Sequence, residues 1–194
     1  MRDGTPYRII GGVRFYERKE VKDALSYLKL IINPHDDVSF RRVVNVPSRG
    51  IGRTVMEALD AIDPGDHEAH TPLFNAGLQP APSPRSLWAR TLVALERRAM
   101  PPRALTALKP SRDMLVALTA DVAGASVSTT MGLMLDRSGY LHDLREERSE
   151  ESEGRIENLM ELVSAAREYE SRDDEPSLGG FVDRLSLLSE ADEA

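Results

Sequence analysis

Apolar residues recur at helical spacing along most of the chain, so the sequence predicts an all-α fold. The first strong segment covers about residues 17–33, and its apolar side chains fall on one helical face: Val21, Ala24, Leu25, Leu28, Ile31 and Ile32. Asn33-Pro34 should end this helix, because a residue before proline disfavours the α conformation. Asp36 or Asp37 is then expected to cap a second helix that contains Phe40.

The same spacing predicts further helices along the rest of the chain. They are expected after Thr54, after Ser86, after Ser111, over residues 126–138, over residues 155–169 and after Ser177. The serines are predicted N-caps, because a hydroxyl oxygen can accept a hydrogen bond from an unpaired amide of the first turn. Trp88 lies on an apolar face and should anchor the core. The acidic residues 146–153 are expected to form a solvated loop or a helix end.

Two segments lack a helical period. Residues 7–15 read as a short strand that is interrupted by the pair Gly11-Gly12. One short strand cannot build a sheet, which suggests that its partners belong to a larger protein. Residues 63–86 are rich in proline, and we interpret them as a mobile loop or linker.

The composition is that of one globular domain. The chain has 194 residues, 41% of them hydrophobic and 29% charged. It has no cysteine, which excludes disulfides, thiolate metal sites and cysteine nucleophiles. No run of apolar residues approaches the roughly 18 that a membrane span needs, so no membrane partner is expected. A cytoplasmic location fits these features.

Charge is distributed unevenly along the chain. Residues 1–60 carry 11 Lys/Arg and 8 Asp/Glu, whereas residues 143–194 carry 6 Lys/Arg and 17 Asp/Glu. The net charge of the whole chain is −7. A polyanion should therefore approach the first third of the molecule and avoid the last.

The most informative motif is the hexapeptide Arg49-Gly50-Ile51-Gly52-Arg53-Thr54, between two amphipathic segments. Two glycines allow a sharp turn of the helix-hairpin-helix type, and the next helix then begins with unpaired N–H groups. Such an N-terminus binds phosphate, and Arg49, Arg53 and the Thr54 hydroxyl could add contacts. These contacts would hold a duplex by its backbone without reading bases. The alternative is a plain helix–helix turn in which the glycines serve geometry alone.

Other candidate sites are weaker. Gly11-Gly12 lacks the spacing of a phosphate-binding loop. Asp36-Asp37 fits a helix cap better than a catalytic carboxylate pair. Arg14 stands beside two aromatic residues that could stack on unpaired bases or belong to the core. The four histidines are scattered, so we assign no catalytic residue, metal ligand or cofactor site.

Two stretches resemble a known family. Residues 7–53, YRIIGGVRFYERKEVKDALSYLKLIINPHDDVSFRRVVNVPSRGIGR, resemble the start of subdomain 2B in UvrD/PcrA/Rep-like superfamily 1 DNA helicases. The shared pattern is a glycine pair, an aromatic residue, Arg-x-Glu-Ile/Val-Lys-Asp, Asn-x-x-Asp-Asp and Asn-x-Pro-x-Arg-Gly-Ile-Gly. Residues 154–162, GRIENLMEL, are similar to the family's Arg-Ile-Glu-Asn-Leu-x-Glu-Leu signature near the end of that subdomain. The proline-rich residues 63–86 depart from the family, in which this region is usually shorter and more helical.

The resemblance implies an accessory subdomain of a larger bacterial enzyme. Family members couple ATP hydrolysis, with Mg²⁺, to 3′-to-5′ movement on DNA through two motor domains. The Walker motifs are not in this sequence, so the chain alone is expected to have no cofactor and no ATPase activity. Its implied partners are double-stranded DNA at a fork junction and the motor domains of the parent chain, in a nucleoid-associated protein of DNA repair or replication.

The resemblance also implies boundaries and sites. Residues 1–16 would be a strand remnant and hinge of motor domain 2A, 17–188 the helical 2B subdomain, and 189–194 a second hinge or tail. Duplex contacts carry over to the hexapeptide 49–54, and Arg14, in a motif next to the family's single-strand track, is a weaker DNA-binding candidate. The hinge candidates are Gly11, Gly12 and Ser189. The rival interpretation is a protein-interaction module that recruits repair or transcription partners and has no direct role on DNA.

Overall fold

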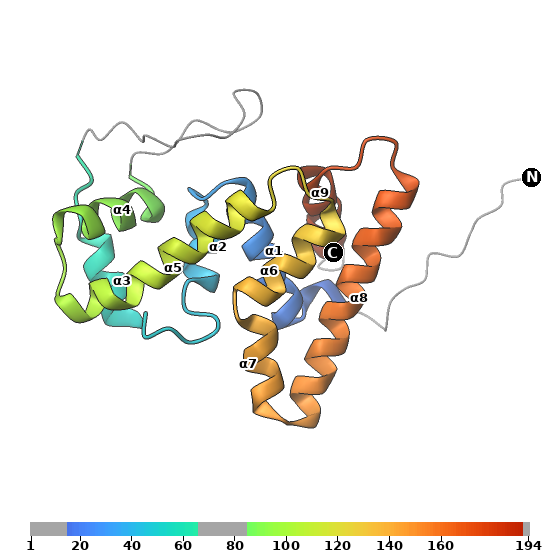
Figure 1. Ribbon diagram of the computed structural model, residues 1–194, viewed down its shortest axis with the longest axis horizontal. Coiled ribbons are helices and arrows are strands. Elements are labelled where there is room, and N and C mark those ends of the chain that lie inside the picture. Colours follow the sequence, from blue (N-terminus) through green and yellow to red (C-terminus); the bar gives the residue numbers. More distant parts are fainter. Residues whose placement is uncertain (1–14, 66–84, 192–194) are drawn as a thin grey trace, which may run out of the picture.

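The protein is all-helical, as the sequence predicts (Figure 1). The computed structural model describes residues 15–65 and 85–191, and no strand occurs in these ranges. The predicted strand remnant, Gly11, Gly12 and Arg14 lie outside them. The described elements are a 3₁₀ turn η1 (Phe15–Glu17) and helices α1 (Lys19–Ile32), α2 (Asp37–Val43), α3 (Arg53–Asp60), α4 (Leu87–Arg97), α5 (Pro102–Asp121), α6 (Val127–Arg137), α7 (Tyr140–Glu147), α8 (Glu150–Arg172) and α9 (Leu178–Ala191).

Helix α1 is the centre of the fold. It contacts α2, α5, α6, α8 and α9, and Lys19 is its only exposed residue. Helices α3 and α4 and the beginning of α5 form one end of the long axis, and α8 and α9 lie toward the other (Figure 1). The helix that follows the predicted phosphate-binding turn, α3, therefore lies at the other end of the molecule from α8 and α9.

Several helix starts follow the predicted capping chemistry. The side chain of Asp36 accepts a hydrogen bond from the Ser39 amide at 3.0 Å. Ser86 caps α4 and Ser126 caps α6 in the same way. Trp88, in the first turn of α4, is 7% exposed, which confirms its prediction as a core residue. These features were predictable because each cap bonds to residues of its own first turn.

Other boundaries differ from the prediction. Ser111 caps no helix, because it lies inside α5, which begins at Pro102 and continues through Pro110. Buried residues on both sides of Pro110, such as Leu108 and Leu115, hold this helix in the core despite the missing amide donor.

The acidic stretch is mostly helical. Only Arg148 and Ser149 separate α7 from α8, and α7 has no counterpart in the prediction. Ser149 forms a capping box with Ser152 at the start of α8. Three glutamates in that first turn also favour the helix, because negative charge suits the positive end of the helix dipole. This is why α8 begins five residues before the predicted Arg155.

A buried polar network joins α1 to three other helices. Asp23, 1% exposed, receives hydrogen bonds from the Tyr140 hydroxyl at 2.9 Å and pairs with Nε of Arg42 at 2.8 Å. Glu20, 5% exposed, accepts a bond from the Asn158 amide at 2.6 Å. Both carboxylates on α1 are thus paired with polar groups of α2, α7 or α8, as buried charges require.

The Tyr140 phenol works in this network as a donor. Burial, reinforced by the neighbouring charge of Asp23, raises its pKa far above the usual range for tyrosine. The phenol is therefore protonated at neutral pH and can donate to Asp23. A tyrosine that could not donate would leave Asp23 with one partner fewer inside the core.

Removing this donor should destabilise the fold. We expect Tyr140→Phe to lower the free energy of unfolding by about 2 kcal/mol, because a buried hydrogen bond to a charged group is lost. Urea denaturation followed by circular dichroism measures this. Tyr169→Phe is the matched control, since Tyr169 is similarly buried but its hydroxyl has only a 3.4 Å bond from the Ser177 amide. Equal losses in the two variants would contradict the importance of the Asp23 contact.

Candidate nucleic-acid interface

The segment between α2 and α3, residues 44–52, contains most of the predicted hexapeptide. It has no regular secondary structure, and side chains hold it in place instead. The Asn45 side-chain oxygen accepts hydrogen bonds from the amides of Arg49, at 2.7 Å, and Ile51, at 3.1 Å. The polypeptide is thereby folded around one carboxamide immediately before α3.

The Arg49 side chain is turned into the protein. Its guanidinium donates to the Tyr27 hydroxyl at 2.9 Å and to the Ser138 carbonyl, at the end of α6, at 2.6 Å. It also donates to three carbonyls of its own segment, those of Val43, Val44 and Val46, at 3.0–3.2 Å. A planar group with five N–H donors suits such a set of converging acceptors. The guanidinium therefore holds the segment and does not face solvent as a cation available to phosphate.

Tyr27 completes this arrangement. Its hydroxyl accepts from Arg49 and lies within hydrogen-bond reach of the carbonyls of Val43 and Val46. Burial raises the pKa of the Tyr27 phenol, although the neighbouring Arg49 guanidinium partly opposes this. The neutral phenol can thus donate to a carbonyl while it accepts from arginine. Residues from α1 and α6 together fix where the segment meets α3.

Ile51 anchors the turn between two exposed glycines. Its side chain is 2% exposed and belongs to the core. Gly50 has φ +77°, a left-handed conformation that glycine adopts without strain. A Cβ atom at Gly50 would lie 3.9 Å from the Cβ of Ala107, so the turn passes close to α5. The backbone at Gly50 and Gly52 is consequently at the surface although Ile51 is not.

Gly52 caps α3 without a side chain. The first backbone bond of the helix runs from the Met56 amide to the Gly52 carbonyl at 3.1 Å, and no side chain within residues 15–65 and 85–191 caps the preceding amides. The backbone amides of Arg53, Thr54 and Val55 therefore lie at an uncapped, positively polarised helix end. The Arg53 side chain is 91% exposed and pairs with Glu57, through Nε, at 2.7 Å. Thr54 is exposed beside it.

The structure divides the predicted contact residues into two groups. The backbone of Gly50 and Gly52 and the side chains of Arg53 and Thr54 are exposed, whereas the side chains of Arg49 and Ile51 point inward. The predicted hinge residue Ser189 lies in the last turns of α9, which continues to Ala191. In the parts of the chain that the structure describes, no group of acidic or histidine side chains could hold a metal ion. No described helix is long and apolar enough to cross a membrane.

Sequence analysis missed the partners of Glu20, Asp23 and Asn158. The signal was present, because α1 carries two carboxylates, Glu20 and Asp23, among apolar residues on a helix that is buried almost all round. What the sequence lacked was a way to place Tyr140 and Asn158, which lie more than 100 residues further along the chain.

Comparisons with known proteins address the family directly. The model of the UvrD-like helicase C-terminal domain matches residues 1–69. The ATP-dependent DNA helicase PcrA of Bacillus subtilis is 32% identical over 193 residues, which covers 100% of this chain and 24% of that protein. DNA helicase II of Haemophilus influenzae is 34% identical over 97% of the chain, and DNA helicase II of Escherichia coli is 35% identical over 89%.

The chain spans about a quarter of the length of these relatives. Their matches extend beyond the N-terminal family model, through the acidic C-terminal third, so the similarity is not confined to one motif. The chain belongs to the UvrD/PcrA family of superfamily 1 DNA helicases, as a segment that folds into an all-α domain.

Proposed function

We propose that this chain is the accessory 2B subdomain of an ATP-dependent 3′-to-5′ DNA helicase, and that it holds duplex DNA ahead of the fork. The observation that carries the proposal is the exposed, uncapped start of α3, with Arg53 and Thr54 beside it. Its relatives are ATP-dependent DNA helicases by name. The surface offers amides and a cation together, the combination that phosphate groups bind.

The contact would be with the sugar-phosphate backbone. The amides of the first turn of α3 are donors at fixed positions, and a bound phosphate oxygen would accept from them. Such contacts carry no sequence information, which suits a protein that must move along any DNA. Arg53 would give up its exposed partner Glu57 at little cost, because surface ion pairs contribute less than about 1 kcal/mol.

Arg49 has a different part in this proposal. Its guanidinium already binds the carbonyls of Val46 and Ser138, so a phosphate would have to displace contacts that hold the turn. We therefore assign Arg49 the role of a positioning residue for Gly50 and Gly52. Ile51 has the same role, as an apolar anchor in the core.

The charge distribution supports one orientation on DNA. The acidic C-terminal third, residues 143–194, lies mainly in α7, α8 and α9, away from α3 (Figure 1). A duplex would be repelled by that end and would approach the end that carries α3. Because few phosphate contacts are involved, the isolated chain should bind duplex DNA with a Kd of about 10⁻⁴–10⁻⁶ M at physiological salt.

The remaining functions belong to the proposed parent protein. ATP hydrolysis with Mg²⁺ would occur in its motor domains, and this chain would regulate them by swivelling about hinges near Gly11, Gly12 and Ser189. The chain alone should show no ATPase activity in a coupled assay. Turnover by the purified chain would contradict its assignment as an accessory subdomain.

A charge reversal at the exposed arginine tests DNA contact. We expect Arg53→Glu to weaken binding to a fluorescein-labelled duplex about tenfold at low salt, because a phosphate contact is replaced by repulsion. Fluorescence anisotropy measures the affinity. Arg145→Glu, the same change at an exposed arginine of α7, should leave affinity within twofold. If Arg53→Glu has no effect, the turn is not the DNA site and a protein-interaction module becomes the better interpretation.

A conservative change separates position from contact at Arg49. Arg49→Lys keeps the charge but loses the forked donors, so we expect the free energy of unfolding to fall by about 2 kcal/mol. Arg53→Lys, at a site 91% exposed, should change it by less than about 0.5 kcal/mol. Urea denaturation of both variants gives the comparison. Unchanged stability together with weakened duplex binding in Arg49→Lys would instead make Arg49 a direct contact.

A further inference from the structure

The carboxylate-free stretch with the most Lys and Arg residues lies outside the Gly50–Thr54 turn. Between Arg97 and Arg112 the sequence, RRAMPPRALTALKPSR, contains five Lys/Arg residues and no carboxylate, in a chain with net charge −7. It covers the end of α4, the α4–α5 turn and the first half of α5. The structure can therefore show which of these cations are available to a ligand.

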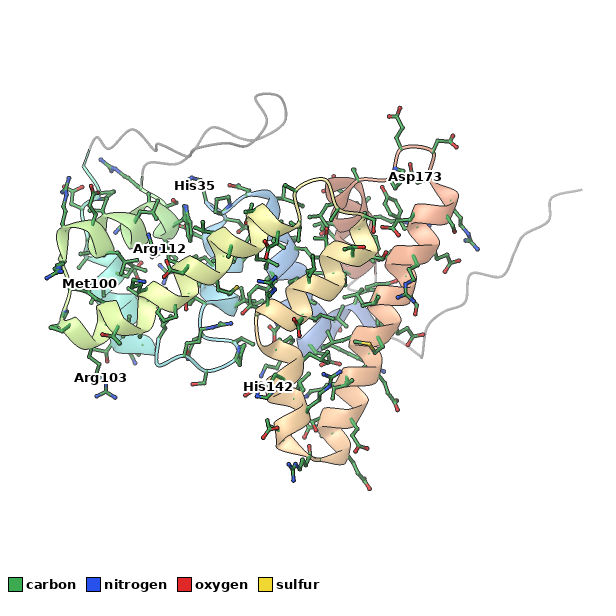
Figure 2. All side chains as sticks on the ribbon, viewed as in Figure 1. His35, Met100, Arg103, Arg112, His142 and Asp173 are labelled. Atoms are coloured by element: carbon green, nitrogen blue, oxygen red, sulfur yellow. The ribbon has the colours of Figure 1, made fainter. Side chains whose placement is uncertain are left out.

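Two of the five cations have no ion partner. Lys109 and Arg112 both pair with Asp113, at 2.7 Å and 2.6 Å. The side chains of Arg98 and Arg103 make no hydrogen bond or ion pair with any residue that the structure describes, and both are exposed. Arg103 extends outward from the beginning of α5 (Figure 2). These two arginines carry positive charge that the fold itself does not use.

Arg103 lies near the turn that precedes α3. A Cβ atom at Gly50 would lie 3.9 Å from the Cβ of Ala107 in α5, and Arg103 precedes Ala107 by one helical turn on the same face. The α-carbons of Arg103 and Ala107 are about 6 Å apart along the helix, because each residue rises about 1.5 Å. Arg98, the C-cap of α4, precedes Arg103 by five residues along the chain. The α4–α5 turn and the Gly50–Thr54 turn thus face the same end of the molecule (Figure 1).

We propose that the α4–α5 turn is a second phosphate-binding point, through Arg98 and Arg103, for the duplex that the start of α3 contacts. This inference rests on the proposed function. A duplex presents one charge per about 1.7 Å of its axis, so neighbouring phosphates lie within reach of both turns at once. Two points of contact fix the direction of a duplex across a surface, which one point alone cannot do.

The backbone at Arg98 permits a clean test. Arg98 is the C-cap of α4, with φ +52° and ψ +42°, and glycine relieves strain in this left-handed region. Arg98→Gly therefore removes the charge without threatening the fold. Arg148 caps α7 in almost the same conformation, with φ +50° and ψ +39°, at the acidic end of the protein. Arg148→Gly makes the identical change where no DNA contact is proposed.

The experiment measures anisotropy of a labelled blunt duplex with the full 194-residue chain at several salt concentrations. We expect Arg98→Gly and Arg103→Gln each to weaken binding about threefold to tenfold at low salt. Each should also reduce the slope of log K against log salt by about 1, because one phosphate contact releases about one counterion. Arg148→Gly should match the unaltered chain in both quantities.

The outcomes separate this inference from the function on which it rests. If Arg53→Glu weakens binding but Arg98→Gly and Arg103→Gln do not, the second point is absent and the first remains. If the α4–α5 variants weaken binding but Arg53→Glu does not, the second point is supported and the site at the start of α3 is wrong. Losses equal to those of Arg148→Gly, or no duplex binding by the unaltered chain, would overturn the second point.

Discussion

The candidate DNA surface depends on a single internal cation, the guanidinium of Arg49. It draws together the end of α2, the Tyr27 hydroxyl of α1 and the Ser138 carbonyl that ends α6. Without it, the carbonyls of Val44 and Ser138 would lose the donor that the guanidinium supplies, and an unpaired buried carbonyl costs more than a made hydrogen bond gains. The glycine turn needs such a support because it has no secondary structure of its own. The inward-facing Arg49 guanidinium thus fixes the position of the exposed backbone at Gly50 and Gly52.

The residues that carry the family resemblance mostly hold the fold together. Within the Arg-x-Glu-Val-Lys-Asp stretch, Glu20 and Asp23 bind Asn158 and Tyr140, while Arg18 donates to the Asn158 side chain. Asn158 itself belongs to the second signature. Two motifs about 140 residues apart therefore meet in one polar network around α1. The two motifs are far apart along the chain but adjacent in the packed helices. Their polar residues pair with the buried carboxylates of Glu20 and Asp23.

Contacts between residues close in the sequence, such as helix caps, could be predicted. Contacts between residues far apart in the sequence could not. The caps at Asp36, Ser86 and Ser126 involve only their own first turns, so pattern and residue type sufficed. The exposed position of Arg53 also follows from its place after the glycines. The inward turn of Arg49 could not be foreseen, because its partner Ser138 lies 89 residues away. Helix α5 was misread at Ser111 because packing against the core carries a helix across a proline that local rules treat as a boundary.

Helix α5 has a mechanical consequence. Its 20 residues span about 30 Å without a break, from the cationic turn at Arg103 to the neighbourhood of α6. A rod of this length acts as a lever, so a load applied to its outer end is felt at its inner end as torque. Pro110 has no amide to donate, so one carbonyl near the middle of the rod lacks its usual helical hydrogen bond. A displacement of the outer end of α5 would therefore be carried to the centre of the protein by one helix.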